Sequence, residues 1–172
     1  MSIKEFKIKQ GEISIPQGHL VYRRVEPIEG VVSGEKVPGR CFLYDDYVST
    51  MSKPEVFYEI VRLEVNEDCR GCGFGRKLVE QFMAEQKPQS VVLRAGILYE
   101  EQYNELREKD CLYDYIEDNI KPFWEKMGFV DVNQTAFYFE EGIPMLYPRE
   151  RAEAIINSYA DNSGAFKATN LF

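Results

Sequence analysis

The pattern of apolar and polar positions predicts a chain in which strands and helices alternate. Residues 56–65 are rich in β-branched and aromatic side chains, which predicts a long central strand. Residues 76–86 carry apolar side chains at helical spacing, and this helix should end before Pro88. Residues 90–94 form a short apolar run of the kind that buried strands contain. Together these segments predict an α/β fold with a sheet flanked by helices.

The two ends of the chain carry weaker patterns. Short strands are predicted at 5–9, 19–25, 40–44, 46–50, 136–139 and 145–147, and a loop at 26–39. A helix is predicted from Arg149 to Tyr159, because Pro148 suits a helix start. No repeat and no domain boundary is visible, so residues 1–172 are expected to form a single domain.

Three glycines lie between the predicted central strand and the helix that follows it. Gly71, Gly73 and Gly75 allow the backbone to turn sharply and to approach a ligand closely. The helix behind them directs free N–H groups and a positive dipole end toward the loop, which is how proteins bind phosphate. Arg70 is a candidate for an additional charge-assisted contact. The spacing matches neither the dinucleotide pattern G-x-G-x-x-G nor a nucleotide P-loop.

The segment 65–75 resembles the signature of the GCN5-related N-acetyltransferases (GNAT). Their pattern [RQ]-x-x-G-x-[GA] is filled by Arg70, Gly73 and Gly75, five residues after the strand-ending valine. The segment 123–129 resembles the family's F-Y-x-K-x-G-F helix end, where Gly128 is expected to cap the helix. The resemblance covers roughly residues 56–147. It implies a strongly twisted mixed sheet flanked by helices, with two neighbouring central parallel strands splayed apart.

The same resemblance implies that acetyl-CoA is the cosubstrate. Pantetheine would lie in the gap between the splayed strands, and backbone N–H groups of the loop would hold the pyrophosphate. The residues implied to bind the cofactor are Leu63, Glu64, Val65, Arg70, Gly71, Cys72, Gly73, Phe74, Gly75, Arg76 and Trp124.

Acetyl transfer to an amine requires a base, an oxyanion donor and a leaving-group acid. Glu59 matches the catalytic glutamate of the histone-acetylating branch, although a purely structural strand carboxylate is the alternative, and Glu64 is a weaker candidate. The resemblance implies Val65 N–H as the oxyanion donor. Trp124 stands where many relatives carry a tyrosine, and an indole N–H is a poor acid. Tyr113, Tyr115 or solvent are the remaining candidates for the acid.

Two segments depart from the family. The helix pair that usually follows the first strand is not visible in the N-terminal third. Residues 96–118 form an insertion rich in Asp, Glu and Tyr. This insertion is predicted to be either a solvated helix face or an acidic rim that attracts a cationic amine. The final residues, Leu171 and Phe172, are predicted to belong to a loose tail or to form a contact in a homodimer.

Composition narrows the class of protein. The net charge of −8 disfavours binding to nucleic acid, and no apolar run is long enough to cross a membrane. The start of the chain is too polar for a secretory signal, so a cytoplasmic protein is expected. Cys69 and Cys72 form a C-x-x-C motif, but His19 is the only histidine and no second pair completes a zinc site. We therefore expect no metal and assign both cysteines to variable loop positions.

The sequence thus predicts an N-acetyltransferase that transfers an acetyl group from acetyl-CoA directly to a primary amine, with no covalent enzyme intermediate. The alternative is a non-catalytic protein of the same fold that binds CoA or acyl-CoA. Trp124, the atypical N-terminal third and the insertion favour that alternative.

Overall fold

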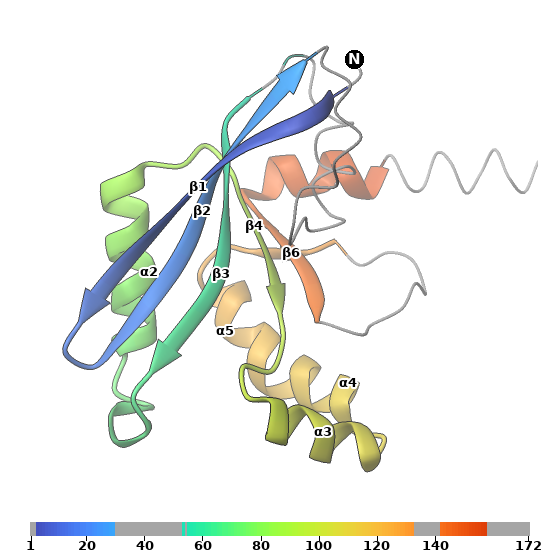
Figure 1. Cartoon of the computed structure of the whole chain (residues 1–172). Coiled ribbons are helices and arrows are strands. Elements are labelled where there is room, and N and C mark those ends of the chain that lie inside the picture. Colours follow the sequence, from blue (N-terminus) through green and yellow to red (C-terminus); the bar gives the residue numbers. More distant parts are fainter. Residues whose placement is uncertain (1–2, 30–52, 54, 133–141, 158–172) are drawn as a thin grey trace, which may run out of the picture.

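A computed structural model describes residues 3–29, 53, 55–132 and 142–157. Six strands form one sheet in the order β1-β2-β3-β4-β6-β5 (Figure 1). Their bounds are β1 Ile3–Ile15, β2 Gly18–Glu29, β3 Phe57–Val65, β4 Val91–Ala95, β5 Val130–Asp131 and β6 Ile143–Tyr147. Among the strands that the structure describes, only β3 and β4 pair in parallel, and the other pairs are antiparallel. This mixed sheet confirms the predicted fold class.

The N-terminal strands form a long hairpin with only Pro16 and Gln17 between them. No helix lies between β1 and β2. This agrees with the sequence, in which the family's usual helix pair is not visible. The predicted loop at 26–39 is wrong at its start, because residues 26–29 continue β2 and pair with β1. Pro27 is tolerated there because β2 no longer pairs with β3 beyond Val25, so its missing N–H costs no bond on that side.

The two faces of the sheet are covered by different helices. On one face, α2 (Phe74–Gln86) buries Leu78, Val79 and Phe82 in a core that Trp124 also joins. On the other face, the helix at 149–157 packs against a second cluster around Phe57. From β3, Tyr58 and Ile60 enter the first core, whereas Phe57 enters the second.

The segment after β4 is helical and longer than predicted. It contains α3 (Glu100–Glu108), α4 (Leu112–Tyr115), a π-turn η2 (Ile116–Ile120) and α5 (Lys121–Lys126). The last three run on as one helix, which continues past position 118, the C-terminal bound of the predicted insertion. Pro122 explains the π-turn: it has no N–H, and its ring would clash with the carbonyl of Asp118 in a regular α-helix.

The end of this helix confirms the predicted cap. Gly128 has a φ of +92°, a left-handed conformation that glycine adopts without strain. Its N–H donates to the Glu125 carbonyl (3.0 Å), and Phe129 N–H donates to the Trp124 carbonyl (3.1 Å). These two bonds form a Schellman motif.

Several predicted segments lie outside the described residues. They are the strands at 40–44, 46–50 and 136–139, the end of the last helix beyond residue 157, and the C-terminal Leu171 and Phe172. In the described part of the chain, no helix is both long and apolar enough to cross a bilayer.

Candidate functional site

A cavity of about 1000 Å³ opens where β3 and β4 separate. The two strands pair only from Tyr58 to Ile60 on β3, whereas β3 itself continues to Val65. At this point the pairing with β2 passes from Ile60 directly to Arg62, which leaves Val61 as a bulge. A bulge bends its strand and increases the local twist. We attribute the divergence of β3 from β4 to this bend.

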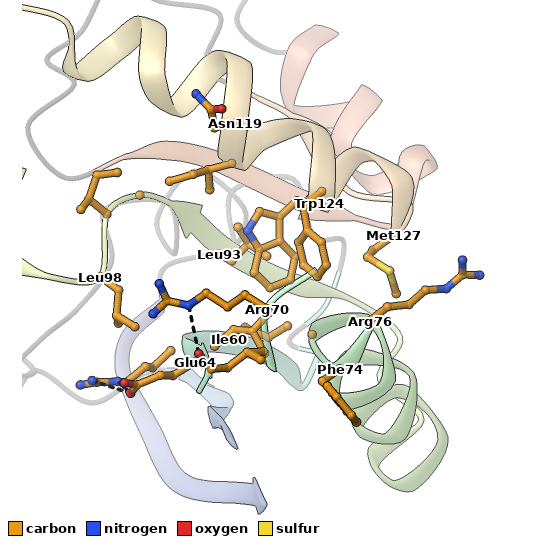
Figure 2. A pocket seen from close by; sticks show the side chains of 18 of the residues that line it. Ile60, Glu64, Arg70, Phe74, Arg76, Leu93, Leu98, Asn119, Trp124 and Met127 are labelled. Atoms are coloured by element: carbon orange, nitrogen blue, oxygen red, sulfur yellow. Dashed lines mark hydrogen bonds and ion pairs between the residues drawn. The ribbon is translucent and has the colours of Figure 1, made fainter. Parts of the chain in front are cut away.

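The cavity has two walls. β3 and the N-terminus of α2 form one, and the end of β4 with the helix 112–126 forms the other (Figure 2). Leu93 and Trp124 lie on the second wall, across from Ile60 on the first. The splayed strands therefore open onto the glycine loop, as the resemblance implies.

The strand register shows which backbone groups face this gap. Asn66 N–H donates to the Gln17 carbonyl (2.8 Å), and paired residues in an antiparallel ladder alternate between bonded and non-bonded positions. The backbone of Glu64 is therefore directed toward β2. The N–H and C=O groups of Leu63 and Val65 are directed away from β2, toward the gap that β4 leaves open.

The loop before α2 has the open geometry expected of an anion site. Gly71 and Gly73 have φ values of +77° and +84°, and a Cβ added to either would meet no atom within 4 Å. The first bond along the helix joins Lys77 N–H to the Gly73 carbonyl (3.0 Å), so the preceding amides have no acceptor within α2. Gly75 instead allows the backbone to lie close to the Phe123 ring, because a Cβ added to Gly75 would be 3.4 Å from that ring.

The charge inside the cavity is opposite to the charge of the whole chain. Five lining side chains are basic and two are acidic. The basic ones are Arg62, Arg70, Arg76, Arg94 and Lys126, and the acidic ones are Glu59 and Glu64. An excess of positive charge inside a cleft attracts an anionic ligand even when the protein is acidic overall.

The two cavity carboxylates have different surroundings. Glu59 is largely buried, with a side chain 12% exposed, and its Oε1 lies 3.9 Å from Arg23 Nη1. Glu64 accepts a hydrogen bond from the Tyr99 hydroxyl (2.7 Å) and another from Arg62 Nη2 (2.7 Å). Both bonds lower the pKa of Glu64, and the bond from Tyr99 has the larger effect. The bond between Tyr99 and Glu64 also raises the pKa of the Tyr99 hydroxyl.

Arg70 does not point into the glycine loop. Its Nε donates to the Val65 carbonyl (3.2 Å) and its Nη2 donates to the Tyr99 hydroxyl (3.2 Å). Its guanidinium carbon also lies 5.7 Å from the centre of the Tyr99 ring. Figure 2 shows this side chain reaching across the cavity toward Leu98 and away from Arg76. In this arrangement the Arg70 guanidinium is bonded to the end of β3 and to Tyr99.

Aromatic side chains fill the second wall. Trp124 is buried and packs edge-to-face against Phe123 and Phe129, with ring centres 5.0 and 5.4 Å apart. Tyr115 also lines the cavity, and its hydroxyl accepts a hydrogen bond from Gln102 Nε2 (3.2 Å). Tyr113 is 48% exposed and does not line the cavity.

The π-turn explains why Tyr115 and Trp124 share one cavity. They are nine positions apart, which is about 2.5 turns of a regular α-helix and would place them on opposite sides. The π-turn takes up one additional residue and so rotates Tyr115 toward the side of Trp124. Asn119 Nδ2 donates to the Tyr115 carbonyl (3.0 Å) within this widened turn.

The structure brings most of the predicted site residues together. Every one of them lines the cavity except Cys72, which is exposed and not among the lining residues. Cys72 was included because of its place in the loop, but its side chain is turned to solvent. The roles of the lining residues remain predictions.

The insertion contributes uncharged residues to the lining of the cavity. None of its carboxylates is among the lining residues. It supplies Leu98, Tyr99 and Gln102 beside Tyr115. Among the described residues, no cluster of three His, Cys, Asp or Glu side chains is arranged to hold a metal ion.

Comparisons with known proteins yield only distant structural similarities. No protein-family model and no curated protein sequence matches the chain. Among solved structures, it is similar to the NatC complex bound to Gag peptide and CoA, with 18% identity and a TM-score of 0.38 over 78% of this chain and 62% of that one. It is also similar to AtaTR bound with AcCoA, with 14% identity and a TM-score of 0.37 over 80% and 64% of the two chains.

A third similarity is to the histone acetyltransferase HPA2 and related acetyltransferase from Corynebacterium glutamicum. Identity is 14% and the TM-score 0.34, over 77% of this chain and 65% of that one. The chain therefore spans less than two thirds of the length of each of these proteins. The fold itself is a six-stranded mixed sheet with one splayed parallel pair and a glycine loop before α2, which agrees with the fold that the sequence resemblance implied. The distant similarities say nothing about family or activity.

Proposed function

We propose that this protein transfers an acetyl group from acetyl-CoA to a primary amine, with both substrates bound at once. The observation that carries the proposal is a single cavity joining an open glycine loop at a helix N-terminus to the unpaired edge of β3. A cavity of about 1000 Å³ is large enough for a cofactor of this length.

The cofactor is proposed to bind mainly through backbone groups. The amides from Gly71 to Arg76 would hold the pyrophosphate, because the loop is open at Gly71 and Gly73 and the first amides of α2 have no acceptor within the helix. The Leu63 carbonyl and the outward-facing N–H and C=O groups of Val65 would bond to the pantetheine amides in place of a strand. Trp124 would pack beside the thioester end.

Glu59 is the proposed general base. An ammonium has no lone pair, so the acceptor must lose a proton before its nitrogen attacks the acetyl carbon. A base works best when its pKa lies near the working pH. The pKa of Glu64 is lowered by its bonds to Tyr99 and Arg62, which makes Glu64 the poorer base of the two. Glu59 is largely buried, and its Oε1 lies 3.9 Å from Arg23 Nη1.

The proposed transfer forms the new C–N bond and breaks the C–S bond, releasing CoA as a thiolate. A backbone N–H facing the gap would stabilise the tetrahedral oxyanion. The sequence implied Val65 for this role. We now propose Leu63, because its amide also faces the gap and lies two residues closer to Glu59.

Tyr115 is the proposed acid that protonates the leaving thiolate. Because its hydroxyl oxygen accepts from Gln102, its own proton remains available for donation into the cavity. We expect Tyr115→Phe to lower kcat by roughly tenfold, at the low end of acid–base effects, with the Kd for acetyl-CoA unchanged. Tyr113→Phe is the matched control, and stopped-flow detection of free thiol is the measurement. Equal kcat values in the two variants would exclude Tyr115 as the acid.

The test of the proposal is thiol release from acetyl-CoA across a panel of primary amines. The panel includes polyamines, lysine peptides and aminoglycosides, since the cavity lining contains no acidic rim that favours one class. Amine-dependent release supports the enzyme. Binding of acetyl-CoA without release on any amine supports the alternative, a CoA-binding module, for which Trp124 at the usual acid position is the main argument.

A further inference from the structure

The proposed base lies between arginines on the two neighbouring strands. Arg23 Nη1, from β2, is 3.9 Å from Glu59 Oε1. In the parallel pairing of β3 with β4, Glu59 is opposite Val92, and Arg94 follows two positions later. Diagonal neighbours of this kind are within reach of each other when one side chain is as long as that of arginine. The pairing ends at Leu93, so Arg94 lies where the two strands begin to separate.

Arg94 and Glu59 project from the same face of the sheet. Side chains alternate between the two faces along a strand. The residues directly before and after each of these two belong to the core that α2 covers, so Arg94 and Glu59 project from the opposite face. Those neighbouring residues are Tyr58, Ile60, Leu93 and Ala95. Arg94 and Glu59 also line the same cavity, so a ligand in this cavity has access to both.

The surroundings of the proposed base are therefore more positive than negative. Two guanidinium groups accompany one carboxylate, and the other cavity carboxylate, Glu64, is already bonded to Arg62 (2.7 Å). An acceptor with several ammonium groups would place like charges close together in a partly desolvated cleft, which is unfavourable. A carboxylate is instead attracted there, and it can accept two parallel N–H···O bonds from a guanidinium.

Of the two arginines beside Glu59, Arg94 is the one that a ligand in the cavity reaches. Arg23 is not among the lining residues, whereas Arg94 is. Arg94 takes part in other interactions as well, but its guanidinium has five N–H donors, so it can hold a ligand carboxylate in addition.

We propose that Arg94 determines which acceptors are used, by binding a carboxylate close to the amine that is acetylated. This inference rests on the proposed function, in which Glu59 removes the proton of that amine. With the amine at Glu59, a carboxylate a few bonds away reaches Arg94 on the adjacent strand. The acceptor is therefore an amine with a neighbouring carboxylate, as in an amino acid or at an acidic peptide N-terminus, rather than a polyamine or an aminoglycoside.

The first experiment compares two peptide acceptors that differ only in charge. They are the tripeptide amides Asp-Ala-Ala and Asn-Ala-Ala, in which a carboxylate or an amide stands at the same distance from the α-amine. Thiol release at saturating acetyl-CoA gives kcat/KM for each, beside spermidine as a polyamine. The Asp peptide should be used about tenfold better than the Asn peptide, the equivalent of one charged hydrogen bond, and spermidine less well than either. Free aspartate, measured beside them, distinguishes an amino acid from a peptide as the source of this chemistry.

The variant Arg94→Gln tests whether this residue causes the preference. It should lower kcat/KM about tenfold for the Asp peptide and leave the Asn peptide unchanged. The loss should appear in KM rather than in kcat, because the carboxylate is bound equally before and during the reaction. Arg94→Lys, which keeps the charge but not the paired donors, should give an intermediate preference. Melting temperatures and the Kd for acetyl-CoA confirm that the variants fold.

A matched control distinguishes contact with Arg94 from general attraction by a basic cavity. Lys126→Gln removes one positive charge from the lining at α5 rather than at β4. The ratio of kcat/KM between the two peptides should stay as it is in the unmodified protein. An equal fall of this ratio in Lys126→Gln and Arg94→Gln overturns the assignment to Arg94.

The outcomes separate this inference from the proposed function. Thiol release with no amine of the whole panel overturns the proposed function, and the inference with it. Release with equal kcat/KM for the two peptides, or with a preference for spermidine, overturns the inference alone. A preference for the Asp peptide that persists in Arg94→Gln overturns the role of Arg94, because another group must then bind the carboxylate.

Discussion

Replacing Glu59 by Gln should lower kcat by about 10²–10⁴-fold, the range typical for loss of a general base. The amide keeps the size and much of the polarity of the side chain but cannot accept a proton from the acceptor amine. The Kd for acetyl-CoA should not change, because the cofactor is proposed to bind through the loop and the edge of β3. Thiol release at saturating amine, together with calorimetry of acetyl-CoA, measures both quantities.

Glu67→Gln is the control for this experiment. Glu67 precedes the same loop but is exposed and does not line the cavity, so its variant should keep full turnover. A Glu59→Gln protein with unchanged kcat would show that Glu59 is a structural carboxylate paired with Arg23. A parallel loss in Glu67→Gln would show that the effect is not specific to the cavity.

Placing a negative charge at Gly73 should weaken acetyl-CoA binding strongly. A Cβ at this position meets nothing within 4 Å, and the open space is where the pyrophosphate is proposed to lie. Asp and Asn tolerate a positive φ better than most residues, so Gly73→Asp and Gly73→Asn can be compared at similar strain. Repulsion from the phosphates should make binding to the Asp variant at least roughly tenfold weaker than to the Asn variant.

The salt dependence of this pair identifies the cause. The difference between Gly73→Asp and Gly73→Asn should shrink as ionic strength rises, because salt screens interactions between exposed charges. Titrations of both variants with acetyl-CoA at low and high salt measure this difference in affinity. Equal affinities in the two variants would mean that no anionic group of the ligand lies at the N-terminus of α2.

The sequence predicted the parts of the fold that local patterns specify. The apolar run of β3, the helical spacing of α2 and the capping glycine at 128 each depend on short segments whose conformational preferences agree with the final structure. The position of the cavity could be predicted from these elements, because the glycine loop and the edge of β3 are adjacent in sequence. Most predicted site residues consequently lie together.

The features that the sequence did not predict depend on contacts between distant residues. Residues 26–29 carry loop-like composition but are held in β2 by pairing with β1. The π-turn arises where Pro122 meets an otherwise continuous helix, and periodicity alone did not indicate its position. Tyr99 entered the site through hydrogen bonds to Glu64 and Arg70, residues about thirty positions away.

Charge was the least reliable guide to the site. The acidic composition of the insertion left open a solvated helix face or a rim for a cationic substrate. Its carboxylates do not line the cavity, and Glu105 and Glu117 pair with lysines four positions away. The cavity lining is basic because β3, β4, α2 and α5 each contribute a basic side chain. No single segment of the sequence therefore shows the excess of positive charge. Net charge describes the whole surface, whereas a ligand responds to the local arrangement.

Thermal unfolding with and without acetyl-CoA, beside ATP and NAD, tests the central claim most directly. A ligand at about a hundred times its Kd adds roughly 2.7 kcal/mol to the free energy of unfolding. For a chain of this size, that corresponds to a rise in Tm of roughly 5–11 °C. We predict this rise with acetyl-CoA and a much smaller change with ATP or NAD. No rise at millimolar acetyl-CoA would contradict the assignment of the cavity as a cofactor site and, with it, the proposed activity.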